Sequence, residues 1–258
     1  MKLTWLGTAG FRIESHQHTL LIDPYFTRNK KAFPRQALKP SDIQTADMIL
    51  ITHGHFDHIF DVPQIASKTG ATVYCGRGVD QTLIQNGLNA SQIRRVKTDG
   101  QTFRFDDLKI QAFFSRHIQF DRWLMFKTLC RIHIGLPGYL PLLRNYPEGQ
   151  VLSWRISLEG KVLHHFGSGG SPKSELEKLG RRPPDILLVP MQGHTRITRI
   201  AHNYVTCLNP KMVIPHHQDN FFPPISTLVD TQPFAEQVKT SHPEMAVQIP
   251  GINEIIEI

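Results

Sequence analysis

The sequence predicts an α/β (α+β) fold in which two β-sheets pack face to face and helices cover their outer faces. Strand-like segments followed by helical segments occur twice along the 258 residues, as expected of two sheet-and-helix halves. The run Met48–Thr52 is continuously apolar, which is typical of a strand buried on both faces. The chain has no short fixed repeat and no Gly/Ser-rich linker, so we expect a single domain over residues 1–258.

Short β-rich segments separated by turn residues dominate the first fifty residues. Before the apolar run, the expected strands are Leu3–Leu6, Phe11–Glu14 and Thr19–Ile22. After it, the pattern predicts a helix over Asp57–Ser67, a strand over Thr72–Cys75 and a helix over Val79–Asn86 that Gly87 ends.

Two hairpins and a second alternation of helices and strands follow. The first hairpin joins Phe103–Phe105 to Leu108–Phe114, and the second joins Val151–Leu158 to Lys161–Phe166 through Glu159-Gly160. The remaining expected elements are a helix within Ser174–Gly180, a strand at Ile186–Val189, a helix at Ile197–Leu208, a strand at Met212–Pro215, a helix near Pro233–Thr240 and a last strand pair near Ala246–Ile258.

The composition gives weaker indications. The formal charge of +7 suggests either an anionic substrate or surface, or merely a solvated basic face. Three widely spaced cysteines, Cys75, Cys130 and Cys207, fit a reduced, cytoplasmic protein. The chain enters a strand pattern at once and has no apolar run of about 18 residues, so neither a signal peptide nor a membrane-spanning helix is expected.

An apolar and basic segment, Phe120–Pro147, interrupts the alternation and forms the middle of an insertion at about 118–150. One interpretation is a core or dimer-contact element, which would make the protein a homo-oligomer. The other is a lid that covers an amphiphilic, lipid-like substrate or touches a membrane, since large aromatic and basic residues together suit an interface.

The strongest functional signal is the string Thr52-His53-Gly54-His55-Phe56-Asp57-His58, directly after the buried strand. Imidazole and carboxylate groups are good ligands for Zn²⁺, and also for Mn or Fe. Residues 53 and 55 can lie on one side of an extended backbone, and Asp57 and His58 then open a helix whose N-terminal dipole favours a carboxylate. The string predicts a metal site, and two further histidines follow strands and are candidate ligands: His117 and His217.

These residues resemble the metallo-β-lactamase fold superfamily, and most closely its branch of L-ascorbate-6-phosphate lactonase-like and N-acylphosphatidylethanolamine phospholipase D-like hydrolases. The HxHxDH string at 53–58 carries the most specific part of the match. Softer matches are Leu6–Gly10, Leu21–Tyr25, Ser115–His117 and Pro215–His217 followed by Phe221. The resemblance implies a four-layer αββα sandwich with the metals at one edge, between the sheets.

The resemblance also implies the role of each residue. His53, His55 and His117 would hold a first metal, and Asp57, His58 and His217 a second. His216 is the alternative to His217, and Asp23 would fix a ligand imidazole through its ring N–H. After another buried strand, His194 is either a pocket residue or an ordinary loop histidine.

Ser168 is a departure from the family pattern, because it stands where an aspartate usually bridges the two metals. Serine carries no charge to hold two cations together. Three outcomes follow: one firmly and one weakly bound metal, a substitute such as His164 or a water, or an inactive protein.

The expected activity is metal-dependent hydrolysis, in which a metal-bound water becomes a hydroxide nucleophile near neutral pH. The predicted cofactor is Zn, as one or two ions, and Asp57 serves as general base if only one is held. The expected substrate is an ester, lactone or phosphodiester. The basic composition favours an anionic one, and the apolar insertion favours one that is amphiphilic. The alternatives are an inactive metal-binding or sensing protein, and a nuclease. No basic run with interleaved aromatics supports nucleic-acid binding.

Overall fold

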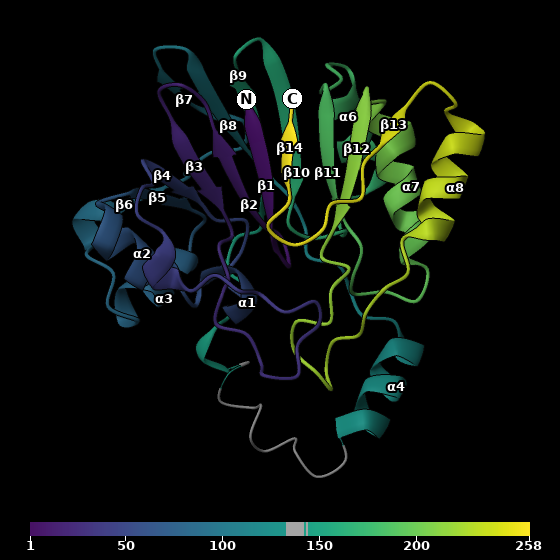
Figure 1. Ribbon diagram of the computed structural model, residues 1–258, viewed down its shortest axis with the longest axis horizontal. Helices are drawn as coiled ribbons and strands as arrows, with labels where there is room; N and C mark the ends of the chain where they lie inside the picture. Colours follow the sequence, from purple (N-terminus) through teal and green to yellow (C-terminus); the bar gives the residue numbers. More distant parts are fainter. Residues whose placement is uncertain (133–141, 143) are drawn as a thin grey trace.

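The computed structural model describes residues 1–132, 142 and 144–258, and within them two seven-stranded sheets lie face to face (Figure 1). The first sheet has the order β14-β1-β2-β3-β4-β5-β6 and the second β13-β12-β11-β10-β9-β8-β7. The strands of the first sheet are β1 (Lys2–Gly7), β2 (Gly10–Glu14), β3 (Thr19–Ile22), β4 (Met48–Leu50), β5 (Thr72–Cys75), β6 (Ile93–Arg95) and β14 (Ile255–Glu257). Those of the second are β7 (Gln101–Phe105), β8 (Leu108–Phe114), β9 (Leu152–Leu158), β10 (Lys161–Phe166), β11 (Ile186–Pro190), β12 (Met212–His216) and β13 (Ala246–Val247).

Helices flank the two sheets, which gives the sandwich its outer layers (Figure 1). They are α1 (Phe56–Ile59), α2 (Val62–Thr69), α3 (Val79–Gln85), α4 (Arg122–Ile132), α6 (Lys173–Gly180), α7 (Ile197–Leu208) and α8 (Gln232–Ser241). Leu83 of α3 and Ile65 of α2 belong to a core cluster on the outer face of the first sheet, whereas Tyr204 of α7 and Phe234 of α8 belong to one outside the second.

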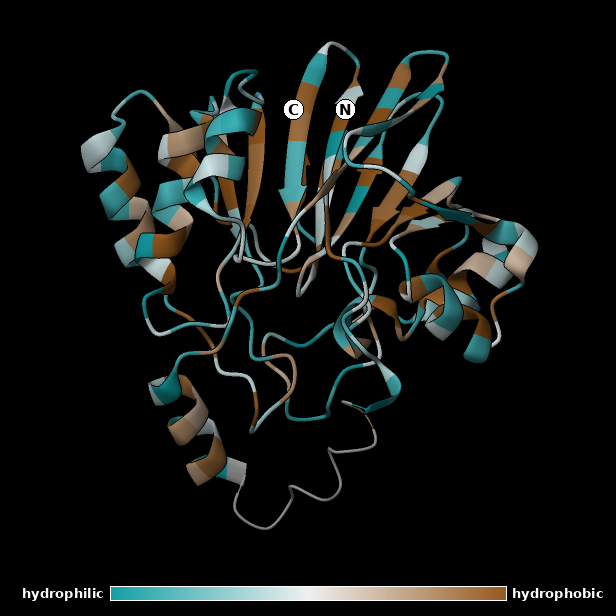
Figure 2. Ribbon diagram, turned by 180° about the vertical axis from the view of Figure 1, so that it is seen from behind, coloured by the Kyte–Doolittle hydropathy of each residue, from teal (hydrophilic) through white to brown (hydrophobic). Residues whose placement is uncertain are grey.

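The central core fills the space between the sheets. Trp5 and Phe11 from the first sheet meet Trp154 and Leu188 from the second, all almost completely buried. Figure 2 shows the corresponding apolar stretches along the strands. Burial of this apolar surface, at roughly 25 cal/mol per Å², holds the sheets together without a disulfide, and all three cysteines are free.

The structure corrects four element predictions. The helix expected over Asp57–Ser67 is two helices, α1 and α2. Asp61 lies between them, and its carboxylate accepts hydrogen bonds from Phe26 N and Thr27 N of a distant segment. The strand expected to reach Thr52 ends at Leu50; Ile51 N still donates to Tyr74 O, but Thr52 N bonds to the side chain of Asp23.

Strand β6 was not expected, because Ile93–Arg95 is too short and basic to show a pattern. The last strand pair is also wrong as a pair: β13 joins β12 in the second sheet, and β14 joins β1 in the first. Sequence proximity therefore did not decide pairing at the C-terminus.

The insertion between β8 and β9 carries α4, which lies below the sandwich on the same side as α1 (Figure 1). The remainder of the insertion around 133–141 and 143 lies outside the described residues. Among the described helices, none is long and apolar enough to span a membrane.

Candidate metal centre

Six side chains form two ligand sets at the edge where β4 runs into α1. The first set contains His53, His55 and His117, and the second contains Asp57, His58 and His217. Within each set, one potential ligand atom per residue lies within 4.8 Å of the others. The ring centroids of His53 and His58 are 3.8 Å apart, so the two sets adjoin.

The backbone after β4 presents these ligands because it has left the sheet. Thr52 N donates a 2.8 Å hydrogen bond to Asp23 Oδ1 instead of continuing the ladder. Gly54 N donates to Glu148 O at 2.7 Å, and a Cβ at this position would collide with the backbone of Pro147. Glycine is therefore needed for this close approach, rather than for a positive φ.

One buried carboxylate, Asp23, orients ligands of both sets. Its Oδ2 accepts a 2.7 Å hydrogen bond from His58 Nδ1 and a short one from the Thr52 hydroxyl. The Thr52 oxygen lies 3.1 Å from His53 Nδ1, where it can accept the ring proton. The Nε2 atoms of His53 and His58 are thereby left with free lone pairs for a metal.

His117 is positioned by the segments that follow β8 and β10 of the second sheet. Its Nδ1 lies 2.7 Å from Ile118 O and donates to it, which leaves Nε2 free. Ile118 N in turn donates to Ser168 Oγ at 3.0 Å. A Cβ at Gly170 would overlap the His117 carbonyl, so a glycine is required for the chain after β10 to pass here.

His217 is placed by an unusual backbone conformation. Its φ is +59°, in the left-handed region, and its N–H donates to Thr8 O at 2.8 Å. Thr8 N is bound by the carboxylate of Asp219, which pairs with Arg28 Nη1 at 2.6 Å. Surrounding contacts of this kind hold a residue in a conformation that it would otherwise leave.

Comparison with known proteins decides the family. A family model described as "Beta-lactamase superfamily domain" matches residues 2–217. A UPF0173 metal-dependent hydrolase of Thermococcus onnurineus is 31% identical over 264 residues, covering 100% of each chain. One of Pyrococcus furiosus is 31% identical over 231 residues, covering 88% of each. The chain belongs to the UPF0173 family of metal-dependent hydrolases, within the metallo-β-lactamase superfamily.

A solved structure has the same fold. A metallo hydrolase of the archaeon Ignicoccus hospitalis matches with a TM-score of 0.70 at 23% identity, covering 100% of this chain and 98% of that one. The family model thus confirms the predicted superfamily, and the structural match confirms the two-sheet fold.

The three imidazoles of the first set are in the protonation state that a metal requires. Burial lowers the pKa of His53 and His55, and it lowers the pKa of His117 to about 4, with neighbouring imidazoles adding to the effect. Neutral imidazole is the form that donates a lone pair, so the first set fits a metal ion with nitrogen preference.

The second set carries the negative charge. Burial alone would raise the pKa of Asp57, but His58 and His217 outweigh it and lower the pKa well below its usual range. Asp57 Oδ2 lies 3.5 Å from His58 Nε2 and 3.4 Å from His217 Nε2. Two imidazoles and one ionised carboxylate also fit a divalent cation.

A cavity of ≈ 70 Å³ opens onto both sets, and Ser168 lines it with them. Asp57 is the only carboxylate in the lining described by the structure. His164 does not replace the missing aspartate, because its ring is buried elsewhere, 3.1 Å from Ser153 Oγ. Of the two substitutes considered for the bridging aspartate, His164 and a water, this leaves a water.

The other histidines considered lie outside the two sets. The His216 ring is fully buried and stacks on His165, with the ring centroids 4.8 Å apart. His194 lines a neighbouring groove, with Nδ1 3.1 Å from Asp121 Oδ2. The structure thus brings His217, and neither of these two, to Asp57.

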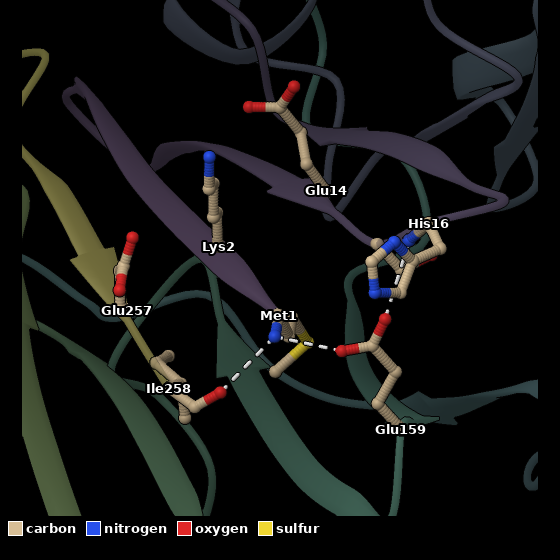
Figure 3. Close-up of a pocket in the computed structure, with 8 residues that line it drawn as sticks. Met1, Lys2, Glu14, His16, Glu159, Glu257 and Ile258 are labelled. Carbon is tan, nitrogen blue, oxygen red and sulfur yellow. Dashed lines mark hydrogen bonds and ion pairs between the residues drawn. The ribbon is translucent and has the colours of Figure 1, made fainter.

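A larger hollow of ≈ 610 Å³ lies at the opposite end of the sheets, beside the chain termini (Figure 3). There the Met1 amino group lies 2.8 Å from Glu159 Oε2 and donates to Ile258 O at 3.2 Å. Neither ligand set reaches this hollow, so size alone does not identify the metal centre.

Sequence reasoning missed the supports of the centre. Four side chains or backbone groups support the ligands: those of Thr52, Thr8, Arg28 and Asp219. Thr8 and Arg28 lie far from any ligand in the sequence. The only signal was that Thr52 begins the histidine string. The tie from Asp219 to Thr8 spans 211 residues and has no local pattern.

Proposed function

We propose that this metal-dependent hydrolase cleaves an ester, lactone or phosphodiester bond in an anionic substrate, at the two adjoining ligand sets. The observation that carries the proposal is that three neutral imidazoles and a carboxylate-bearing set share one cavity. Water inside such a cavity lies within reach of both sets. The proposed cofactor is zinc, because its tetrahedral preference suits three protein ligands and one open position.

The chain's own residues prepare the site for water and substrate. A bound metal ion would act as a Lewis acid and lower the pKa of a coordinated water. Asp23 fixes the tautomers of His58 and, through Thr52, of His53. Asp57 lies with His58 and His217 in the second ligand set, which favours a ligand role over that of general base.

Ser168 supports unequal metal sites. Its oxygen accepts the Ile118 N–H, so its own proton is free to point into the cavity. A neutral hydroxyl cannot offset a second divalent charge. We therefore assign the firmer site to His53, His55 and His117, and to Ser168 a hydrogen bond to substrate or water.

The preference for an anion rests on the charge around the site. The net charge is +7, and Asp57 is the single carboxylate in the described lining of the cavity. A substrate carrying phosphate or carboxylate would be attracted to such a surface.

Metal analysis and turnover together test the proposal. Purified protein should contain zinc and hydrolyse at least one of bis-p-nitrophenyl phosphate, a p-nitrophenyl ester and a lactone. His55→Ala should lower both zinc content and rate, whereas His16→Ala, at an exposed histidine remote from the site, should change neither.

A different result would favour the second candidate, a metal-binding or sensing protein without turnover. Ser168 is the observation behind it, because the usual bridging charge is missing. Normal zinc content without hydrolysis of any of the three substrate classes would sink the enzymatic proposal.

A further inference from the structure

A groove of ≈ 620 Å³ adjoins the metal cavity and is open to solvent. Four residues line both hollows: Phe120, Gln192, Gly193 and Phe221. The two hollows therefore adjoin at these residues. Binding sites for small molecules typically enclose about 300–1,000 Å³, so the groove can hold much more than the cavity can.

The walls of the groove are largely apolar and come from three segments. One wall is α4, through Leu124, Phe126 and the aliphatic stems of its basic residues. The second is the segment after β11, with Met191. The third is the segment 221–229, which contributes Ile225 and Leu228. Figure 2 shows apolar bands on α4 although this helix lies outside the sandwich.

The groove is a built feature, because α4 is tied to the opposite wall. Asp121 Oδ2 accepts hydrogen bonds from Thr195 N at 2.7 Å and from Thr195 Oγ1 at 3.0 Å. The other oxygen, Oδ1, accepts from Trp123 N and Leu124 N at 3.0 Å and so caps the helix. One carboxylate thus fixes the width of the groove at its end nearest the metal centre.

Among the described residues, no carboxylate forms an ion pair with the lysine and arginine side chains of the groove. Lys127 and Arg131 both line it, and the Nη1 atom of Arg131 is buried without a hydrogen-bond partner among the described residues. Asp121 is the only carboxylate in the immediate neighbourhood that the structure describes, and Thr195 and the helix N-terminus already use it. The Nε of the same guanidinium donates to Lys127 O at 3.1 Å, so Nη1 is the buried donor that lacks an acceptor, and an anion in the groove would supply one.

We propose that this groove binds the apolar chain of an anionic amphiphile and so makes such a molecule the substrate. That the bound molecule is hydrolysed rests on the proposed function. That it binds in the groove does not, because binding needs no turnover. The chain lies between α4 and segment 221–229, with negative charge met by Arg131 and Lys127. The scissile bond then reaches the metal cavity past Phe120 and Phe221.

Cys130 gives a direct readout of groove occupancy. It lines the groove and is exposed, whereas Cys75 is buried, so a Cys207→Ser background leaves one readily reactive thiol. Decanoate, below its micelle concentration, should slow the reaction of Cys130 with dithionitrobenzoate several-fold. Acetate should not, and an equal rate with and without decanoate would overturn the proposal.

Matched variants assign the effect to the groove. Leu124→Asn should abolish most of the protection, whereas Leu129→Asn, on the same helix but outside the groove lining, should retain it. Arg131→Gln should weaken protection by decanoate but leave protection by decanol unchanged. Equal loss with Leu124→Asn and Leu129→Asn would mean that helix integrity, and not the groove, explains the result.

Turnover separates this inference from the proposed function. With zinc-loaded protein, kcat/KM for p-nitrophenyl decanoate should exceed that for the acetate by about tenfold or more, since each buried methylene adds binding energy. Hydrolysis without chain-length preference or thiol protection would refute the groove and leave the proposed function intact. Protection without hydrolysis of any substrate would support the groove and refute the proposed reaction.

Discussion

At the scale of single residues, Asp23 does more than any ligand to shape the centre. It lies at 0% exposure and bonds His58 directly and His53 through Thr52, so one carboxylate fixes imidazoles of both ligand sets. Its position between β3 and the strand that carries the ligands also joins two parts of the first sheet.

Asp23→Asn should lower metal affinity about 10–100-fold, the range found when groups behind metal ligands are removed. The amide retains the shape but cannot accept from both Thr52 and His58 as a carboxylate does. Competition with a chromogenic zinc chelator measures the change. Asp107→Asn, at an exposed turn, is the matched control, and equal affinities for both variants would contradict this role.

Ser168→Asp should raise the metal content per chain, because it adds a carboxylate to a cavity that already holds both ligand sets. Inductively coupled plasma mass spectrometry after dialysis against limiting zinc measures the gain. Ser168→Ala should show none. If the aspartate variant binds no more metal than the alanine variant, Ser168 does not stand between the two sets.

At the scale of elements, the position of α4 depends more on the hydrogen bonds of Asp121, just before the helix, than on the packing of its side chains. Its large side chains include exposed ones such as Trp123, Phe126 and Leu129. Hydrogen bonds from Thr195 and Leu124 lower the pKa of the Asp121 carboxyl. The group is therefore ionised at neutral pH, and its contribution is complete above an unfolded pKa of about 3.9 and is lost as pH falls.

Asp121→Ala should speed hydrogen exchange of the α4 amides while leaving the global melting temperature nearly unchanged, because the helix lies outside the sandwich (Figure 1). Exchange mass spectrometry at neutral pH measures this. Asp230→Ala, which removes the corresponding bond to Gln232 N at α8, should affect α8 alone. Unchanged exchange in α4 would show that other contacts hold the helix.

The remaining expectations about the insertion stay predictions. Peripheral membrane contact and a homo-oligomer contact through residues 120–147 involve segments that lie partly outside the described residues. The part that the structure does describe, α4, contributes a groove wall next to the metal centre.

At the scale of the whole molecule, we expect folding to be separable from metal binding. The three buried clusters lie between and outside the sheets, and no metal-ligand residue belongs to them. The core should therefore persist when the ligands are empty.

Removal of zinc with a chelator should abolish activity and leave the far-ultraviolet circular dichroism spectrum unchanged. The melting temperature should fall modestly, since a ligand at 100 times its Kd contributes about 2.7 kcal/mol. Calorimetry with and without zinc measures the shift. Loss of the spectrum on chelation would instead make the metal part of the fold.

The sequence was informative wherever the physical cause was local. Hydrophobic alternation and turn residues predicted most strands, and the string at 52–58 predicted that four ligand-type side chains would gather. It failed where a distant group intervened, as when Asp61 turned toward Phe26 and split the helix expected over Asp57–Ser67. It also failed for β13 and β14, whose partners are chosen by the sheets and not by their neighbours in the chain.

By itself, the sequence determined that this chain carries a histidine-rich metal string within a two-sheet fold, because periodicity and ligand chemistry are both written in neighbouring residues. Only the tertiary structure decided which distant histidine joins Asp57. His216 and His217 are adjacent in sequence, yet strand direction and a left-handed backbone turn one ring toward His165 and the other toward the metal centre. The groove beside the centre likewise exists only because Asp121 joins α4 to Thr195 across 74 residues.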